Sequence, residues 1–208
     1  MICPLCESAS FSEIGRDRRR PFYLCNACDL VFVPPEYHLS FEQEKRRYDL
    51  HDNTENNQGY VRFLSQVADV AESIYPKGGR FLDFGCGKEA VLRTLLERRN
   101  RICDCFDPLY EHTIDIKNRY DIIILCEVIE HCRNMLETLH SIRRLMLEEG
   151  AVIVRTQCRP DSGDLMQWWY VQDPAHVCFF SARSLSFAAK VMNLTLGTTQ
   201  HKDIFVMR

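Results

Sequence analysis

From residue 80 onward, two kinds of apolar segment alternate along the chain. Short runs in which most positions are apolar predict strands, whereas longer stretches with apolar residues three and four positions apart predict helices. The expected strands span 80–84, 101–106, 120–126 and 150–156. The expected helices span 89–99 and about 134–147. Strands that alternate with helices are typical of a parallel sheet covered by helices, so we expect an α/β fold.

The segments on either side of this core complete the expected architecture. A helix near 183–193 and a strand pair at 194–199 and 203–207 would close the sheet with an antiparallel last strand. Ahead of the core, Ser40-Phe-Glu-Gln43 matches a capping box that opens a charged helix, and a second helix runs from Phe63 to Ile74. Only about a dozen residues separate the second strand from the next one, so we expect the third strand of such a sheet to be shortened or missing.

Composition narrows the class of protein. The chain has 208 residues, is 46% hydrophobic and carries a net charge of −3, with a pI of about 6.2. These values suit one globular domain with a small appendage, and they give no global reason to expect a nucleic-acid or membrane partner. No apolar run could span a bilayer, and the first residues lack the features of a signal peptide. Eleven cysteines, several in apolar runs, favour a reducing cytoplasm over a disulfide scaffold.

Four cysteines near the N-terminus form two C-x2-C pairs. Cys3 and Cys6 make the first pair, and Cys25 and Cys28 make the second after a gap of 18 residues. This spacing is typical of a structural zinc site, in which four thiolates close the tetrahedral shell. We therefore expect a zinc ribbon over 1–35, a helical connector or lid over 36–77, and the α/β domain over 78–208. In the ribbon loop we expect the Arg16–Arg20 run to be solvated, a grip for phosphate being the alternative.

A glycine-containing turn joins the first predicted strand of the α/β domain to a helix. Asp83 lies near the end of this strand, Gly85 and Gly87 lie in the turn, and Asp107 ends the next strand. Glycines let the backbone approach a ligand, and the start of a helix offers free N–H groups. An acid at the end of the second strand can accept both ribose hydroxyls of a nucleotide. No glycine stands at position 90, which disfavours a nicotinamide site.

The pattern resembles motif I of class I S-adenosylmethionine-dependent methyltransferases. Stretches such as Tyr48-Asp-Leu-His51 and 173–181 extend the likeness to a compact bacterial family that joins a zinc ribbon to a short, methyltransferase-23-like domain. The resemblance implies S-adenosylmethionine as cofactor, with Glu89 in place of a usual third glycine. The residues implied to bind the cofactor are Tyr48, His51, Asp83, Phe84, Gly85, Cys86, Gly87, Asp107, Pro108, Cys126 and Glu127.

An acid–histidine motif, Glu127-Val-Ile-Glu130-His131, begins where strand 120–126 ends, at the rim where open α/β sheets bind ligands. It resembles the E-x-x-E-H of metal-dependent O-methyltransferases, among them ubiquinone-pathway and small-RNA 2′-O-methyltransferases. In the RNA enzymes a later histidine completes a metal site, and His176 occupies a comparable place. Two interpretations stay open. Either these four residues hold Mg²⁺, Mn²⁺ or another divalent ion, or Glu127 contacts the cofactor and His131 is the general base, with His176 the second choice.

These features predict an enzyme that methylates a small-molecule acceptor, with oxygen as the expected target. Trp168, Trp169 and Tyr170 are expected in a loop over the pocket, as a substrate wall or as a packed lid. One alternative is a metal-dependent RNA 2′-O-methyltransferase, which the acidic pI opposes. The other is a non-catalytic protein that binds S-adenosylmethionine or interacts through its zinc ribbon. The sequence names neither the acceptor nor the oligomeric state.

Overall fold

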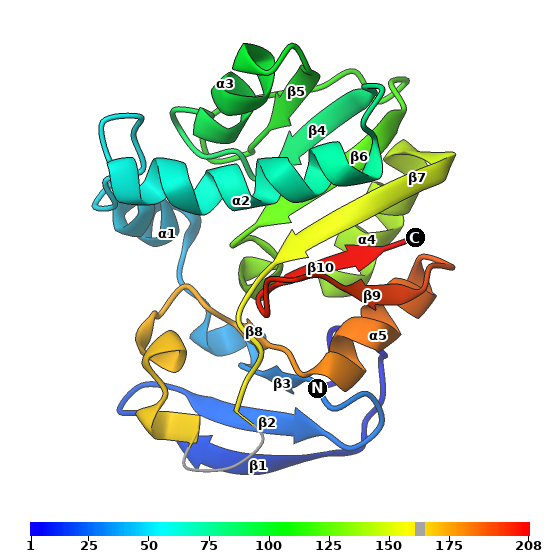
Figure 1. The fold of residues 1–208 in the computed structure, drawn as a ribbon. Helices are drawn as coiled ribbons and strands as arrows, with labels where there is room; N and C mark the ends of the chain where they lie inside the picture. The colour runs from blue at the N-terminus through cyan, green and yellow to red at the C-terminus, as the bar shows by residue number, and fades with distance from the viewer. Residues whose placement is uncertain (161–164) are drawn as a thin grey trace.

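The computed structural model describes residues 1–160 and 165–208, and a six-stranded sheet lies at its centre (Figure 1). The strand order is β5 (Ile102–Phe106), β4 (Arg80–Phe84), β6 (Tyr120–Cys126), β7 (Met146–Arg155), β10 (Ile204–Met207) and β9 (Leu196–Thr198). The first four strands run parallel, whereas β10 pairs antiparallel with both β7 and β9. The predicted sheet and its antiparallel closure are confirmed.

The predicted loss of the third strand is also confirmed. β5 stands at the edge of the sheet, and within residues 107–119 the only pairing is an isolated bridge between Asp107 and His112. A parallel crossover needs a helix and a strand after it, and about a dozen residues cannot supply both. The chain therefore passes from β5 to β6 by a loop.

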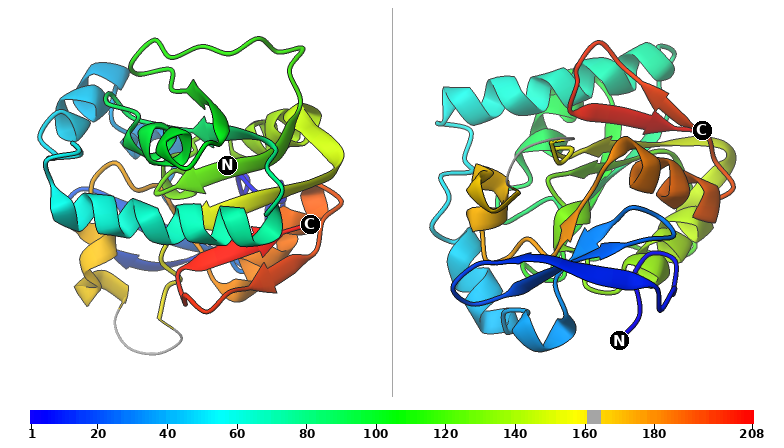
Figure 2. Two further views of the ribbon diagram at one scale, coloured as in Figure 1. Left: turned by 45° about the horizontal axis from the view of Figure 1, so that its top comes forward. Right: turned by 90° about the horizontal axis from the view of Figure 1, so that it is seen from below.

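Helices cover both faces of the central sheet (Figure 2). They are α2 (Gln58–Ile74), α3 (Val91–Arg98), α4 (Met135–Leu145) and α5 (Ala182–Val191), whereas α1 (Phe41–Tyr48) has no buried residue. Successive side chains of a strand point to opposite faces. In β6, Ile122 and Ile124 belong to the core under α2 and α3, whereas Ile123 and Leu125 belong to the core under α4 and α5. No helix among the described residues has the length and apolar character needed to cross a bilayer.

Two predicted boundaries shift for local reasons. Helix α3 begins at Val91 and not at residue 89, because Ala90 has a φ of 46° in the left-handed region. Strand β7 begins at Met146, four positions before the predicted start, so α4 ends at Leu145. Neither shift changes the order of the elements.

The N-terminal strands form a second sheet that includes a strand from the other end of the chain. Its order is β1 (Phe11–Arg16), β2 (Pro21–Cys25), β3 (Val31–Phe32) and β8 (Cys178–Phe179), with every neighbouring pair antiparallel. In the right-hand view of Figure 2, the blue N-terminal strands lie beside the orange segment that contains β8. Phe22 and Phe179 share one buried core with Leu139 of α4. The module is thus packed into the α/β core, and the boundaries at 35 and 77 stay predictions.

Candidate active site

The glycine turn after β4 is tied to the end of β5 by backbone and side-chain hydrogen bonds. The Gly85 N–H donates to the carbonyl of Phe106 at 2.7 Å. The carboxylate of Asp107 accepts from the N–H of Gly87 at 2.8 Å and from that of Leu109 at 2.9 Å. Both glycines have positive φ, 85° and 68°. The structure thus brings together the turn and the acid that the sequence proposes for one cofactor.

The remaining residues of the proposed cofactor site surround this turn with different exposure. Asp83 is buried, and burial, followed by the charge of Asp107, raises the pKa of Asp83 to about 7. Cys86 is buried, Phe84 and Cys126 are half-buried, and Pro108 is exposed. A cationic ligand placed beside Asp83 would favour the ionised carboxylate, which burial disfavours.

Alanine substitutions at Gly85 and Gly87 are expected to distinguish the cost of a steric clash from the cost of backbone strain. A left-handed alanine costs about 1–2 kcal/mol at either position. At Gly85 an added Cβ would also stand 2.4 Å from Cγ2 of Val128, whereas at Gly87 it would meet nothing within 4 Å. We therefore expect Gly85→Ala to lower the free energy of unfolding clearly more than Gly87→Ala does, as measured by urea denaturation. Equal losses in the two variants would contradict the described packing.

Two glutamates follow β6 at the same rim of the sheet, Glu127 half-buried and Glu130 buried. Oε2 of Glu127 accepts from the hydroxyl of Tyr170 at 3.2 Å, and Oε2 of Glu130 accepts from the hydroxyl of Thr156 at 2.9 Å. The other oxygen, Oε1, is buried in each and has no hydrogen-bond partner among the described residues. Burial, followed by the charge of Glu130, raises the pKa of Glu127 to about 8, and burial raises that of Glu130 to about 7. Each of these two Oε1 atoms can therefore still accept a hydrogen bond or bind a cation.

Two histidines face each other beside Glu130. Nδ1 of His131 lies 3.1 Å from the carbonyl oxygen of Ala175, and Nδ1 of His176 lies 2.8 Å from that of Tyr170. A carbonyl only accepts, so each Nδ1 carries the proton and each neutral Nε2 keeps its lone pair. Burial, followed by the charge of His176, lowers the pKa of His131 to about 3, and burial lowers that of His176. The rings are 4.6 Å apart between centroids.

A carboxylate and two imidazoles therefore converge. One ligand atom each from Glu130, His131 and His176 lies within 4.8 Å of the others, with Nε2 of His131 at 3.9 Å from Oε1 of Glu130. Glu127 lies outside this group, so the geometry supports three of the four predicted metal ligands. The segment 129–131 is a short 3₁₀ turn, and Glu127 has a φ of 54°, which directs the two glutamates differently from a regular helix. Glu127 adjoins the cluster through Tyr170.

The three adjacent aromatics meet at Tyr170. Trp168 packs on Tyr170 with ring centroids 5.0 Å apart and also contacts Phe179, and the ring of Trp169, which is 65% exposed, lies 5.2 Å from that of Tyr170. Their role as a substrate wall or as a packed lid stays a prediction. Tyr170 is buried and its hydroxyl lies 3.2 Å from that of Thr156. Thr156 is a site residue that was not predicted from the sequence. The available signal was its position directly after Arg155, the second polar residue beyond the apolar run of β7, at the rim where Glu127 also lies.

Helix α1 places a tyrosine over the histidine pair. The ring of Tyr48 lies 5.2 Å from that of His131, and burial raises the pKa of Tyr48. His51 is exposed and 6.3 Å from the Tyr48 ring. Arg47 forms an ion pair with Asp173 at 2.9 Å, so the helix is fastened to the loop that carries His176. The capping box predicted at the start of this helix is present.

The four N-terminal cysteines form a cluster built from two matching turns. All four Sγ atoms lie within 4.8 Å of one another, and the Cys3–Cys28 and Cys6–Cys25 pairs are 3.5 and 3.4 Å apart. Tetrahedral zinc with Zn–S bonds of ~2.3 Å places its sulfurs ~3.8 Å apart. In each turn the N–H of the residue after the second cysteine donates to the carbonyl of the first cysteine at 2.9 Å, and that residue has positive φ. The donor set and geometry fit zinc.

Comparison with known proteins assigns the α/β domain to a protein family. A family model described as "Methyltransferase domain" matches residues 46–198. The chain belongs to this methyltransferase family. The match covers the glycine turn, the Glu127–His131 segment and His176, and the predicted S-adenosylmethionine-dependent methyltransferase is confirmed. The cysteine cluster lies outside the match. No curated protein matches the chain.

Solved structures share the fold of this methyltransferase at low identity. An O-methyltransferase family protein from Burkholderia thailandensis is 14% identical with a TM-score of 0.59, and the match covers 81% of this chain and 62% of that one. The 1,6-didemethyltoxoflavin-N1-methyltransferase of the same organism is 14% identical with a TM-score of 0.58, over 96% and 97% of the two chains. The N-methyltransferase NodS from Bradyrhizobium japonicum WM9 is 13% identical with a TM-score of 0.52, over 81% and 97%. The chain spans less than two thirds of the first of these proteins.

Proposed function

We propose that this methyltransferase transfers the methyl group of S-adenosylmethionine to an oxygen of a small-molecule acceptor, with a divalent ion held by Glu130, His131 and His176. The observation that carries the proposal is the convergence of two imidazoles, each with an unprotonated Nε2, on Glu130, whose buried Oε1 has no hydrogen-bond partner among the described residues. Lone pairs held this close repel one another unless a cation or a proton lies between them. Imidazole with carboxylate suits Mn²⁺, Fe²⁺ or Zn²⁺ better than Mg²⁺.

The chain's own residues would then align the reaction and exclude water. Gly85 and Gly87 leave room for the cofactor against the backbone, and Asp107 can accept its ribose hydroxyls. The acceptor hydroxyl releases its proton to solvent, and its oxygen attacks the methyl carbon as the sulfur–carbon bond breaks, which leaves S-adenosylhomocysteine. A divalent ion held by Glu130, His131 and His176 would lower the pKa of the acceptor hydroxyl. Tyr48 covers the cluster from α1 and limits solvent access.

If no metal binds, the same geometry supports His131 as the general base. Its Nε2 is unprotonated and could take the acceptor proton, while the bond from Nδ1 to the Ala175 carbonyl fixes the ring and stabilises the imidazolium that results. The low pKa of His131 makes it a weaker base than an exposed histidine. This account is the second choice because it leaves the buried Oε1 of Glu130 without a role.

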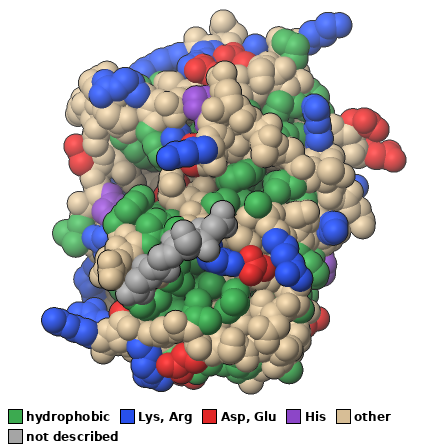
Figure 3. Space-filling model, turned by 60° about the horizontal axis from the view of Figure 1, so that its bottom comes forward, with side chains coloured by type: hydrophobic (Ala, Val, Ile, Leu, Met, Phe, Trp, Pro, Cys, Tyr) green, Lys and Arg blue, Asp and Glu red, His purple; other side chains and the backbone are tan. Residues whose placement is uncertain are grey.

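The surface supports a small-molecule acceptor over RNA. On the face shown in Figure 3, Lys and Arg side chains are interspersed with Asp and Glu and do not gather into one basic surface. Within the arginine run of the ribbon loop, Arg16 pairs with Glu13 at 2.9 Å and Arg20 is buried. Among the described residues, Arg18 and Arg19 are the exposed arginines of that run that form no ion pair. An RNA backbone would need a broader positive surface.

Calorimetric titration of the purified protein tests the proposal. We expect micromolar binding of S-adenosylhomocysteine and, separately, binding of one Mn²⁺ beyond any zinc that copurifies. Incubation with S-adenosylmethionine and a panel of phenols, sugars, amines and a short RNA would then locate the acceptor by a methyl mass gain. Failure of S-adenosylhomocysteine to bind would reject the cofactor site. Cofactor binding without Mn²⁺ binding would favour His131 as base, and methylation of amines alone would reject oxygen transfer.

A further inference from the structure

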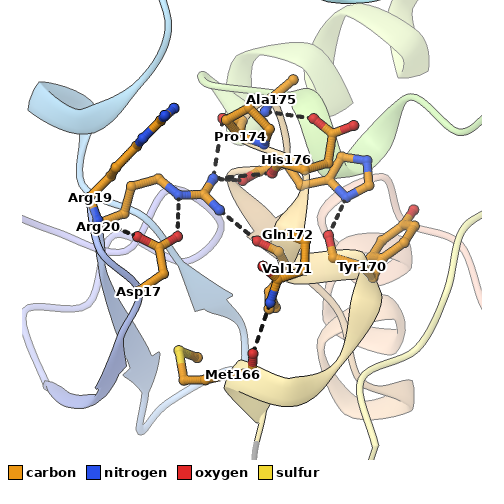
Figure 4. A network of polar contacts seen from close by, with 11 residues as sticks. Asp17, Arg19, Arg20, Met166, Tyr170, Val171, Gln172, Pro174, Ala175 and His176 are labelled. Atoms are coloured by element: carbon orange, nitrogen blue, oxygen red, sulfur yellow. Dashed lines mark hydrogen bonds and ion pairs between the residues drawn. The ribbon is translucent and has the colours of Figure 1, made fainter.

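A single arginine of the N-terminal module reaches the loop that carries His176. Arg20 lies between β1 and β2, and its side chain is only 4% exposed, contrary to the solvated loop that the sequence predicts. Its Nη1 donates to the carbonyl oxygens of Asp173, Pro174 and His176 at 3.2, 3.2 and 2.9 Å, and its Nη2 donates to that of Val171 at 2.6 Å (Figure 4). Four carbonyls of one loop thus point at one guanidinium.

The guanidinium is itself held in place. Nε of Arg20 donates to Oδ2 of Asp17 at 3.0 Å, and Oδ1 of Asp17 accepts from the backbone N–H groups of Arg19 and Arg20. The guanidinium carbon lies 5.2 Å from the centroid of the Phe22 ring. A buried cation needs a counter-ion and a full set of acceptors, and this one has both. The contact therefore acts as a rigid connection and not as a mobile surface contact.

The same loop supplies the two carbonyls that orient the histidines. The carbonyl of Tyr170 accepts from Nδ1 of His176, and that of Ala175 accepts from Nδ1 of His131. Each of these two carbonyls is adjacent in sequence to one that Arg20 binds: Tyr170 precedes Val171, and Ala175 lies between Pro174 and His176. If the guanidinium were removed, the gathered carbonyls would be buried without a strong donor, and the loop would relax to satisfy them. The neighbouring carbonyls would then leave the two histidine rings.

We propose that Arg20 is a positioning residue of the active site: by binding the carbonyls of Val171, Asp173, Pro174 and His176 it fixes the Nδ1–H tautomer and the orientation of His131 and His176. The inference rests on the proposed function only in assigning those histidines to the metal. The N-terminal module is then a part of the active-site framework. Lysine cannot replace Arg20, because an ammonium has three donors on one atom, whereas the planar guanidinium directs donors to Asp17 and to the carbonyls at once.

Nitrogen-15 NMR of the histidine rings tests this assignment in the full-length protein, purified with zinc and without added Mn²⁺. The variants are Arg20→Gln, Arg20→Lys and Asp17→Asn, and the matched control is Arg19→Gln, since Arg19 is the exposed neighbour. In the wild type we expect the Nδ1–H tautomer at both His131 and His176. We expect Arg20→Gln and Arg20→Lys to lose that pattern at both rings and to bind Mn²⁺ about 10–100-fold more weakly. Asp17→Asn should reduce the Nδ1–H tautomer at both rings by a smaller amount, and the control Arg19→Gln should leave it unchanged.

The outcomes are decisive in both directions. Wild-type tautomers in a cooperatively folded Arg20→Gln protein would overturn the proposal. If Arg20→Gln does not fold, the tautomers in Arg20→Lys and Asp17→Asn decide the question. Arg20→Lys keeps the positive charge and Asp17, whereas Asp17→Asn keeps the guanidinium. Failure of the wild type to bind Mn²⁺ would reject the metal but not the role of Arg20, because the tautomers are read without metal. S-adenosylhomocysteine affinity within about 3-fold of wild type would show that the cofactor site is intact.

Discussion

Removal of zinc from the cysteine cluster is expected to melt the N-terminal module and to abolish binding of Mn²⁺ at the cluster of Glu130, His131 and His176. We propose zinc at Cys3, Cys6, Cys25 and Cys28 from the geometry of their sulfurs. Apparent zinc-binding free energies of structural sites are about 10–16 kcal/mol, and this energy is available to folding. The small module, with the two-residue strand β3, cannot make up such a loss from its own core.

The effect should reach the active site because the module and the His176 loop share backbone hydrogen bonds. Strand β3 pairs with β8, which begins two residues after His176. The N–H of Val33 also donates to the carbonyl of Val177 at 2.9 Å, and the N–H of Val177 donates to the carbonyl of Glu130 at 2.9 Å. A chain of backbone contacts thus runs from the cysteine cluster to the proposed ligands.

Zinc can be removed from the cysteine cluster in two ways, by the substitution Cys25→Ser and by treatment with a zinc chelator. We expect loss of bound zinc by elemental analysis, a lower Tm, and at least a 100-fold loss of Mn²⁺ affinity by calorimetry. Cys103→Ser is the matched control, since Cys103 is a buried cysteine in the core under α2 and α3. A zinc-free protein with the Tm and Mn²⁺ affinity of the wild type would contradict the prediction, and absence of zinc from the purified protein would reject the zinc site.

Substitution of any one of the three proposed ligands is expected to remove Mn²⁺ binding while sparing the cofactor. The variants are Glu130→Gln, His131→Ala and His176→Ala. Each removes a ligand atom from a set whose members all lie within 4.8 Å, so a 100-fold or larger loss of Mn²⁺ affinity follows from the geometry. Glu127→Gln should lose less Mn²⁺ affinity, because Glu127 lies outside the set and accepts a hydrogen bond from the Tyr170 hydroxyl.

Calorimetry with Mn²⁺ and with S-adenosylhomocysteine separates the two sites. The matched controls are His140→Ala and Glu137→Gln, which change exposed residues of α4. We expect both controls to retain wild-type Mn²⁺ affinity, and the three ligand variants and both controls to keep S-adenosylhomocysteine affinity within about 3-fold. Equal Mn²⁺ affinity in the wild type and in His176→Ala would show that the ion, if bound, lies elsewhere. A cofactor loss of more than 10-fold in the ligand variants would mean that the two sites are not separate.

The sequence alone determined those features that depend on neighbouring residues. The spacing of apolar positions predicted the parallel strands and their order along the chain, and the short segment after Asp107 predicted the missing third strand. The cysteine spacing and the Gly85–Gly87 turn are local patterns, because a zinc turn or a tight backbone turn is formed by residues adjacent in sequence. The Glu127–His131 motif was visible for the same reason.

The tertiary structure alone decided how distant residues combine. It brought His176 to His131 and turned both Nδ1 atoms to carbonyls, and it separated Glu127 from the three converging ligands. It also buried Arg20 against a loop about 150 positions away. Periodicity reports which face of an element is apolar, but the direction of a side chain at a strand end depends on partners that pack there from elsewhere. From the sequence alone, the run Arg16–Arg20 could be a solvated basic loop or could bind, through Arg20, the loop that carries His176. Only the packing of β3 against β8, which brings these two segments together, decides between the two.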